Sequence, residues 1–149
     1  MRSSSRARIL WLWVLVSILA LSAACSGPGG AGKSVNPETV AMDFTTAFLQ
    51  GDLEKAKEFI KAEAMEKVSQ KLDKSAAIMG QYETTNLEIG STRPWSFGGE
   101  SDKRVEIRFD FRRKGASDEQ WSIGLLAVRV VTTGGTWKIT DLELVRPAK

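Results

Sequence analysis

The spacing of hydrophobic residues changes along the chain, and each change marks a different kind of segment. An unbroken, mostly apolar run of 13 residues, from Ile9 to Leu21, follows three arginines. Such a run suits the hydrophobic region of a secretory signal, about 7–15 residues, and is shorter than the roughly 18 residues that a membrane-spanning helix needs. Small residues then lead to Cys25. The pattern predicts a signal peptide over residues 1–24.

Between residues 36 and 80 the apolar residues recur every three or four positions, which predicts three helices. Asn36 fits the N-cap of the first, Pro37 its first turn, and Gly51 the position that follows its end. Asp52 fits the cap of a short second helix, and the third covers about residues 62–79. The predicted inward positions are Val40, Phe44, Ala47 and Phe48, then Leu53, Ala56, Phe59 and Ile60, and then Met65, Val68, Leu72, Ala76 and Met79.

After Gly80 the hydrophobic period becomes two, which predicts strands. The alternation is cleanest over residues 105–112, where the polar phase predicts one solvated face. The apolar phase of this strand is Val105, Ile107, Phe109 and Phe111, and the polar phase is Glu106, Arg108, Asp110 and Arg112. An earlier strand alternates through Thr85, Leu87 and Ile89. These segments predict neighbouring strands of an antiparallel sheet.

The last third of the chain predicts two more strands of the same sheet. Residues 119–131 are apolar in both phases around Gly124, which predicts a central strand bent at that glycine. Gly134 and Gly135 predict a hairpin turn before the final strand. In that strand the apolar phase slips at Thr140 or Asp141, which predicts a bulge and strong curvature. Helices followed by a curved antiparallel sheet predict an α+β domain over residues 36–149, with the helices on one face.

Residues 25–35 join the predicted signal peptide to this domain. The segment from Gly27 to Ser34 fits the phosphate-binding pattern G-x-x-x-x-G-K-[ST]. That pattern binds nucleotides only between a buried strand and a helix N-terminus, because backbone amides must converge on the phosphates. Here it follows a signal sequence, and its composition is typical of a flexible linker. We therefore expect a tether and no nucleotide binding.

The only cysteine of the chain, Cys25, lies where signal cleavage is expected. The sequence "LSAAC" resembles the lipobox of bacterial lipoproteins, in which this cysteine carries the lipid, although Leu21 stands four positions before the cysteine instead of three. The alternative is an ordinary buried cysteine. An exported chain with one cysteine has no disulfide partner, so its position favours lipid attachment. The resemblance implies a membrane anchor of several acyl chains.

Composition excludes several classes of chemistry. The chain has no histidine, so a Ser-His-Asp or Cys-His nucleophile and a histidine-based zinc site are excluded. Without Arg2, Arg6 and Arg8 the chain has 18 basic and 18 acidic residues, so the domain is neutral. A neutral domain has no strong electrostatic reason to bind nucleic acid. We expect no cofactor and no metal, and only carboxylate, lysine or tyrosine acid–base chemistry stays available.

The domain as a whole resembles the nuclear transport factor 2-like (NTF2-like) superfamily, which is a cystatin-like fold, and within it small bacterial lipoproteins of unknown function. The resemblance rests on the order of elements, on "F..AFLQGDLEKAKEFI" from Phe44 to Ile60, and on "GGTWKITDLEL" from Gly134 to Leu144. It implies a cone-shaped fold with a pocket at its open end. Some members are ketosteroid isomerase-like or polyketide cyclase-like enzymes, which use a carboxylate base in an apolar pocket.

Candidate site residues are few. The carboxylates nearest the predicted core are Asp43, Asp110 and Asp141, and each has a simpler place on a polar phase or at the bulge. Aromatic residues could line a pocket or fill the core, and at these spacings the core is the commoner place. These residues are Phe44, Phe48, Tyr82, Phe109, Trp121 and Trp137.

Two functions follow as hypotheses. The first is a lipid-anchored protein of the bacterial cell envelope, on the extracytoplasmic side, whose domain binds a small apolar ligand or an envelope protein without catalysis. The alternative is a lyase or isomerase of the ketosteroid isomerase type. A carboxylate of raised pKa inside an apolar cavity favours the enzyme, whereas a filled core or an exposed apolar groove favours binding.

Overall fold

The structure is a computed structural model that describes residues 36–95, 99–117 and 120–145. The predicted signal peptide, Cys25 and the predicted tether lie outside the described residues. Among those residues, no helix is both long and apolar enough to cross a membrane. The elements are α2 (Pro37–Leu49), α3 (Leu53–Glu58), α4 (Met65–Met79), β1 (Tyr82–Pro94), β2 (Asp102–Arg113), β3 (Ser122–Thr133) and β4 (Thr136–Val145), with 3-10 turns at Ala62–Ala64 and Gly99–Ser101.

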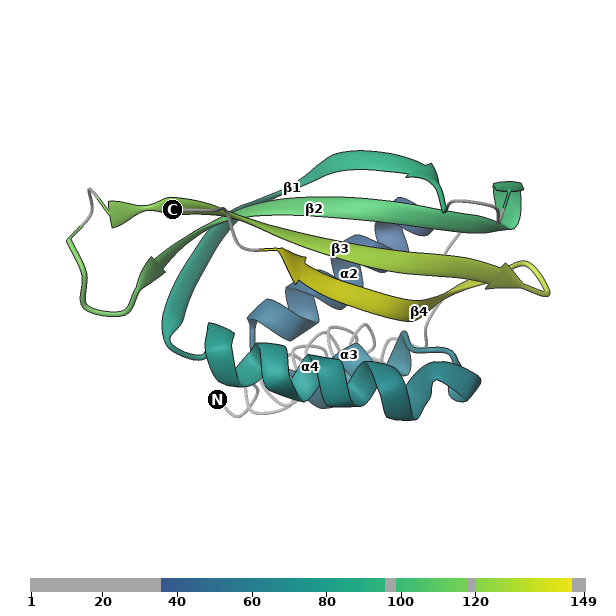
Figure 1. Cartoon of the computed structure of the whole chain (residues 1–149), viewed down its shortest axis with the longest axis horizontal. Coiled ribbons are helices and arrows are strands. Elements are labelled where there is room, and N and C mark those ends of the chain that lie inside the picture. The colour runs from purple at the N-terminus through teal and green to yellow at the C-terminus, as the bar shows by residue number, and fades with distance from the viewer. Residues whose placement is uncertain (1–35, 96–98, 118–119, 146–149) are drawn as a thin grey trace, which may run out of the picture. The chain divides into compact units, whose positions relative to one another are not determined.

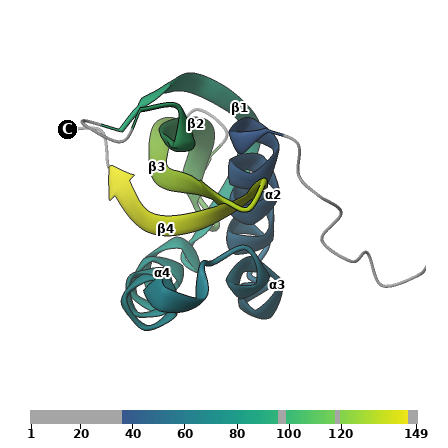
Figure 2. The same cartoon turned by 90° about the vertical axis from the view of Figure 1, so that its right-hand side faces the viewer.

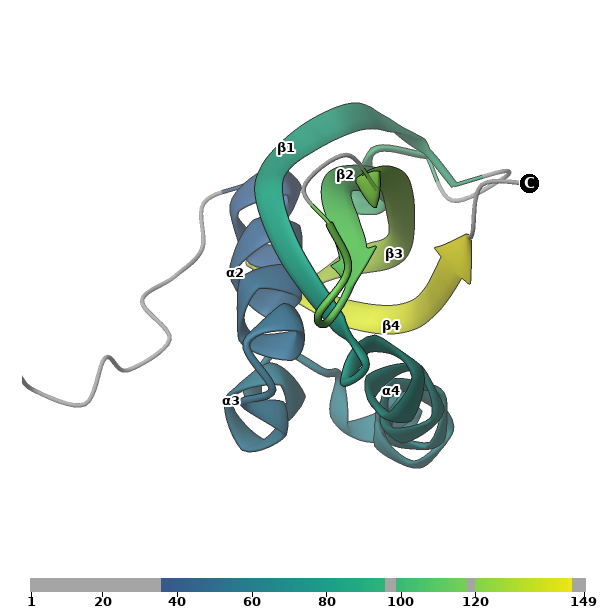
Figure 3. The same ribbon diagram turned by 90° about the vertical axis from the view of Figure 1, so that its left-hand side faces the viewer.

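The four strands form one antiparallel sheet in the order β1-β2-β3-β4, and the helices precede it in the chain (Figure 1). Each strand therefore pairs with its neighbour in sequence, which needs only short connections. Seen along the sheet, the strands bend strongly, and α2, α3 and α4 gather on one side (Figures 2 and 3). The predicted α+β class, with helices packed on a curved antiparallel sheet, is confirmed.

The ends of the first two helices lie where the sequence predicts them. The Asn36 side-chain oxygen accepts a hydrogen bond of 2.7 Å from the Thr39 amide, and Pro37 begins α2. Gly51 has a φ of +80°, the left-handed conformation that favours glycine after a helix. The Asp52 carboxylate accepts from the Lys55 amide at 3.1 Å and so caps α3. Each cap satisfies an amide that has no partner within its helix.

The core lies between α2 and one face of the sheet, which we call the inner face. α2 contacts all four strands, and α4 lies mainly against β4. The predicted stripe of α2 is buried, as is the clean apolar phase of β2 up to Phe109. Burial of each large side chain contributes about 1.5–3 kcal/mol. The fully buried large residues include Val40, Phe44, Val68, Leu72, Val105, Ile107, Phe109, Leu126, Val128, Val130 and Ile139.

Gly124 lies in β3 opposite Phe109 of β2, on the inner face. A Cβ atom at this position would stand 2.6 Å from two atoms of the Phe109 ring. The sequence predicted a bend at this glycine. The structure gives a different reason for it, because the aromatic ring occupies the space that any side chain at position 124 needs.

The edge strand β1 departs from simple alternation. Its pairing with β2 shifts between Thr85 and Glu88, where Asn86 has a φ of 52°, and again between Ile89 and Ser91. Each shift adds a residue that the partner strand does not match, so the side-chain phase changes. The predicted run through Leu87 and Ile89 is wrong at its end, because Leu87 is half-buried and Ile89 is 43% exposed.

The β3–β4 hairpin confirms two predictions. Gly134 and Gly135 form the turn with φ values of 58° and 78°. Arg129 pairs with Asp141 and the next residue, Val130, pairs with Ile139, so Thr140 is the extra residue of a bulge. A bulge bends its strand, and β4, which carries this one, packs against α4.

One helical prediction is wrong. Met65 was expected to point inward, yet it is 36% exposed. Met65 is the first residue of α4, and the buried stretch of that helix begins one turn later, at Val68. A short 3-10 turn occupies the start of the predicted helix, Ala62–Ala64.

Candidate functional site

Inside the part of the domain that the structure describes, a small cavity of about 30 Å³ lies at one end of the core, which is room for about one water molecule. Its lining is apolar apart from the tyrosine, and comprises Ile78, Met79, Tyr82, Phe109, Phe111, Gly124, Leu144 and Val145. The resemblance implied a ligand pocket at the open end of a cone, and this cavity is too small for such a ligand.

Five of the six candidate aromatics pack into or against the core. Phe44, Phe48 and Phe109 are 0–2% exposed. The Tyr82 ring meets the Phe111 ring edge-on, at 5.3 Å between centroids and 85° between planes. Trp137 is half-buried against the core. These rings therefore fill the inner face of the sheet, and of the five only Tyr82 and Phe109 reach the small cavity.

Trp121 is the exception and corrects the sequence interpretation. It precedes the first residue of β3 and is 37% exposed. The guanidinium carbon of Arg112 lies 4.7 Å from the centre of its ring. A cation over an aromatic face is stabilising at a surface, so this side chain has a partner without entering the core.

None of the three candidate carboxylates lines the small apolar cavity. Asp43 is exposed on α2. Asp110 lies on the polar phase of β2 and accepts a hydrogen bond of 2.7 Å from the side-chain nitrogen Nδ2 of Asn86. Asp141 is ion-paired on the last strand. A general base of the ketosteroid isomerase type requires an apolar setting that these positions do not give.

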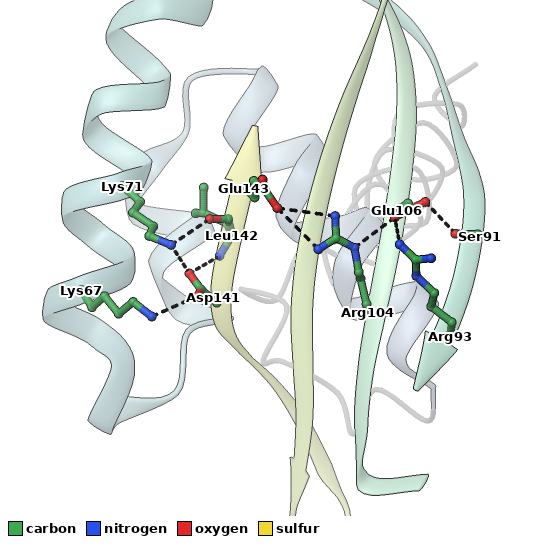
Figure 4. Close-up of polar contacts among 9 residues, drawn as sticks. All are labelled: Lys67, Lys71, Ser91, Arg93, Arg104, Glu106, Asp141, Leu142 and Glu143. Carbon is green, nitrogen blue, oxygen red and sulfur yellow. Dashed lines mark hydrogen bonds and ion pairs between the residues drawn. The ribbon is translucent and has the colours of Figure 1, made fainter. Parts of the chain in front are cut away.

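Asp141 joins α4 to β4 (Figure 4). Lys71 donates to one carboxylate oxygen at 2.5 Å and Lys67 to the other at 3.0 Å, while the Leu142 amide donates at 2.9 Å. Burial on its own would raise the pKa of Asp141, but the hydrogen bonds from the two lysines and the amide outweigh it and hold that pKa below 3.8. The Asp141 carboxylate therefore stays ionised, connects α4 to β4, and is unsuited to take up protons near neutral pH.

The face of the sheet that points away from the core, here called the outer face, carries a chain of ion pairs (Figure 4). Glu106 of β2 accepts from Ser91 at 2.8 Å, from Arg93 at 2.7 Å and from Arg104 at 3.0 Å. Arg104 also reaches Glu143 of β4, at 3.4 Å. The hydrogen bonds from Ser91 and Arg104 hold the pKa of Glu106 below its usual value. These contacts tie β1, β2 and β4 together across the surface.

The same end of the outer face holds a buried ion pair. Asp102 is 6% exposed, and Arg129 donates to both of its carboxylate oxygens. This pairing raises the pKa of Arg129. The half-buried Trp95 has the guanidinium carbons of Arg129 and Arg104 at 5.1 Å and 5.6 Å from its ring centre. A hollow of about 210 Å³ lies beside them, and its charged side chains are already ion-paired: Lys71 with Asp141, Arg104 with Glu143, and Arg129 with Asp102.

The other end of the outer face is hollowed into a groove of about 950 Å³. This volume lies within the roughly 300–1,000 Å³ of small-molecule sites. Ile123 is 61% exposed there, the largest exposure among the exposed large hydrophobic residues. We call this hollow the outer groove; its lining is Asn86, Leu87, Glu88, Arg108, Phe109, Asp110, Ile123, Gly124, Leu125 and Val145.

The outer groove is not predicted from the sequence, although the sequence carries one signal for it. The strand around Gly124 is apolar in both phases, which predicts a central strand bent at that glycine and does not by itself indicate a hollow there. Ile123 and Leu125 are the outward phase of that strand, opposite Asp110 and Arg108. In the described part of the chain no helix covers this face, so Ile123 faces solvent while Leu125 is half-buried.

The described residues hold no group of three histidine, cysteine, aspartate or glutamate side chains that suits a metal ion. Several of their carboxylates, such as Asp102, Glu106 and Asp141, are paired with arginine or lysine instead. The residues Cys25 and Gly27–Ser34, on which the lipid and nucleotide expectations rest, lie outside the described part of the chain.

Comparison with known proteins identifies a fold and no family. No family model matches the sequence, and no curated protein matches it. Among solved structures, a SEC-C motif containing protein from Rhodopseudomonas palustris matches with a TM-score of 0.55 and 19% identity, over 75% of this chain and 80% of that one. At this identity the likeness shows a shared fold alone.

Two further matches carry the NTF2-like name. One is an NTF-2 like protein of unknown function from Shewanella oneidensis, with a TM-score of 0.46 and 15% identity over 71% of this chain and 93% of that one. The other is a protein titled Rd1NTF2, with a TM-score of 0.48 and 12% identity over 72% and 92%. Both scores are below 0.5, so the NTF2-like resemblance of the sequence stays a prediction.

Proposed function

We propose that this chain is an exported lipoprotein of the cell envelope, anchored through Cys25, with an NTF2-like domain that binds its ligand or partner at the outer groove. The anchor is supported by the arginines, the apolar run of 13 residues and the lone cysteine at the expected cleavage site. The binding role is supported by the shape of the domain.

The observation that carries the binding proposal is the contrast between two hollows. The interior cavity measures about 30 Å³, whereas the outer groove measures about 950 Å³. Of these two hollows, only the outer groove has room for a ligand larger than a water molecule. Exposed Ile123 gives that face an apolar contact point for a bound molecule.

The isomerase or lyase alternative gains no support from the described residues. An enzyme of that type places a carboxylate inside an apolar pocket, where burial raises its pKa. Here the apolar cavity is lined without any aspartate or glutamate. Asp141 has its pKa lowered, and Asp110 is bonded to Asn86 beside the open groove. We therefore propose binding as the role of the domain.

The anchor is tested by Cys25→Ser in bacterial cells labelled with a radioactive fatty acid. We expect the label to enter the original chain and to be lost from the variant, which should accumulate as precursor, because a hydroxyl does not replace the thiolate as lipid acceptor. Label that persists in the serine variant would contradict the anchor and leave the groove proposal standing.

The groove is tested by a photoreactive residue placed at position 123 of the full chain in cells. Position 65 on α4 is the matched control, because Met65 is also a large exposed side chain but lies outside the groove. We expect adducts at position 123, identified by mass, and none at position 65. Equal yields at both positions, or no adduct at position 123, would contradict binding at the outer groove.

A further inference from the structure

The charged residues of the outer face fall into two groups that differ in their pairing. At one end of the face, Arg93, Arg104 and Arg129 are each ion-paired with a carboxylate. Arg112 is likewise paired, with Glu83 at 2.8 Å. Arg108, in the same phase of the same strand, has no hydrogen bond or ion pair within the described residues. The one unpaired arginine of this set lines the outer groove.

The position of Arg108 is set by its neighbours on β1. A Cβ atom at Gly90 would stand 3.2 Å from both Cγ and Nε of Arg108, so the arginine stem lies over this glycine. Glu88 is its cross-strand partner by register, yet no ion pair forms between the two. The guanidinium group is therefore exposed at the groove with its donors open to a ligand anion.

Carboxylates stand beside this guanidinium in the same groove. Glu88 is exposed and makes no hydrogen bond or ion pair in the described part of the chain. Asp110 uses one oxygen to accept from Asn86. Its second oxygen has no partner among the described residues. The groove thus offers donors for an anion and acceptors for a cation, both next to an apolar surface of Leu125, Ile123 and Val145.

From this arrangement we infer that the outer groove binds a zwitterionic amphiphile, a lipid whose phosphate pairs with Arg108, whose ammonium group pairs with Glu88 and Asp110, and whose acyl chain covers Ile123. The phosphoethanolamine headgroup has this chemistry. The inference rests on the proposed function, because it names the ligand class of the same groove.

Charge complementarity decides among the ligand classes. A fatty acid or an acidic lipid satisfies Arg108 but leaves its negative charge near Glu88 and Asp110, which is unfavourable. A simple amine has the opposite mismatch. A neutral apolar molecule covers Ile123 and leaves the charged groups desolvated without partners, which also opposes binding. Only a ligand that carries both charges on an apolar body satisfies the whole lining.

The test uses the full chain held in phosphatidylglycerol nanodiscs, with empty nanodiscs as the blank. The probe is dihexanoyl phosphatidylethanolamine below its micellar concentration, measured by titration calorimetry. Dihexanoyl phosphatidylglycerol has the same chains and phosphate without the ammonium group, and glycerophosphoethanolamine has the headgroup without chains. We expect the first probe to bind about tenfold or more tightly than either comparator, the scale of one lost hydrogen bond to a charged group.

Two variants separate the two charges of the ligand. Arg108→Gln should weaken binding of the ethanolamine lipid by about tenfold. Glu88→Gln should weaken the ethanolamine lipid while leaving the glycerol lipid unchanged, so that the preference between them falls. Matched controls are Arg113→Gln at the end of β2 and Glu66→Gln on α4, both exposed and outside the groove. The controls should bind as the original chain does.

Three outcomes would overturn the inference. Equal binding of the ethanolamine and glycerol lipids would contradict the proposed ammonium contact. Unchanged binding of the ethanolamine lipid by Arg108→Gln would contradict the proposed phosphate contact. Trileucine, a zwitterionic apolar peptide, binding as tightly as the lipid would assign the groove to peptides. In each case adducts at position 123 could still form, so the proposed function is judged separately from the lipid.

Discussion

The two faces of the same sheet meet different surroundings, although their strands are shared. The inner face is covered by α2 and α4, and its large residues are close to fully buried. The outer face has no covering helix in the described part of the chain, and it divides into an ion-paired end and the outer groove. Stability therefore comes chiefly from the inner face, and binding is possible on the outer one.

The ion-paired end and the groove differ in how far their polar groups are satisfied. Around Glu106 and Asp102 each carboxylate holds at least one arginine. In the groove, Arg108 and Glu88 have no hydrogen bond or ion pair among the described residues, and Asp110 is bonded only to the neutral side chain of Asn86. A satisfied network rigidifies the sheet, whereas unpaired charges beside an exposed isoleucine are available to another molecule. The place where charged side chains lack a protein partner therefore distinguishes a candidate site from an ordinary solvated face better than the number of charges does.

The strongest test of the inner face is Phe44→Ala. Phe44 is fully buried between α2 and the sheet, so its removal leaves a cavity that the packed core cannot close. We expect the free energy of unfolding to fall by about 3–5 kcal/mol. Chemical denaturation monitored by circular dichroism measures it. A loss below about 1 kcal/mol would mean that the interior is loosely packed, and would reopen the question of a ligand pocket inside the domain.

Much of the fold was predictable because its signals are local. The caps at Asn36 and Asp52, the Gly134–Gly135 turn and the alternation over 105–112 each depend on residues close in sequence. So does the slip at Thr140 that gives the β4 bulge. Short-range patterns of this kind are set by backbone geometry, so the sequence carries them directly.

The candidate site was less predictable because it depends on contacts between distant residues. The ring of Phe109 over Gly124, the bulges of β1 and the position of Trp121 beside Arg112 arise from strand pairing and packing. The small size of the interior cavity could not be foreseen either, because a pattern of aromatic residues is the same whether they line a large pocket or pack against one another. Likewise, the lack of a partner for Arg108 is visible only when its neighbours are placed.

A middle-sized effect is expected for Asp141→Asn, which loosens the ion-paired clamp between α4 and β4. The amide loses the charge that Lys71 and Lys67 contact, and we expect a loss of about 1 kcal/mol near pH 7, reduced because both lysines are partly exposed. The pKa of Asp141 is lower in the folded state than its ordinary value of 3.8. The unfolded chain therefore binds the proton first as the pH falls.

The stabilising contribution of Asp141 is thus complete well above pH 3.8 and is lost as the pH falls from that value through the lower folded pKa. Denaturation of both forms at several pH values measures it, and the difference between them should shrink in acid. Glu143→Gln is the control, because Glu143 is 63% exposed and its contacts with Arg104 are 3.4 and 3.5 Å. A difference that stays constant into acid would show that Asp141 acts by packing instead of charge.

The smallest effect on stability is expected for Ile123→Thr, and it sharpens the comparison of the two faces most directly. Threonine keeps the branched shape that suits a strand, and at a side chain 61% exposed its hydroxyl is hydrated, so the free energy of unfolding should change by less than about 0.5 kcal/mol. Val128→Thr in the same strand is the matched change on the inner face, where the residue is fully buried. There the hydroxyl has no water to bond with, and the expected loss of unfolding free energy is about 1–3 kcal/mol.

The effects of the two variants on binding should have the opposite order. Ile123→Thr removes apolar contact area from the groove and should weaken the binding of dihexanoyl phosphatidylethanolamine. Val128→Thr should leave that binding unchanged under conditions where the protein stays folded. If Ile123→Thr destabilised the domain as much as Val128→Thr, the outer groove would be part of the folded core of this chain, and an added ligand would not be needed to explain its apolar lining.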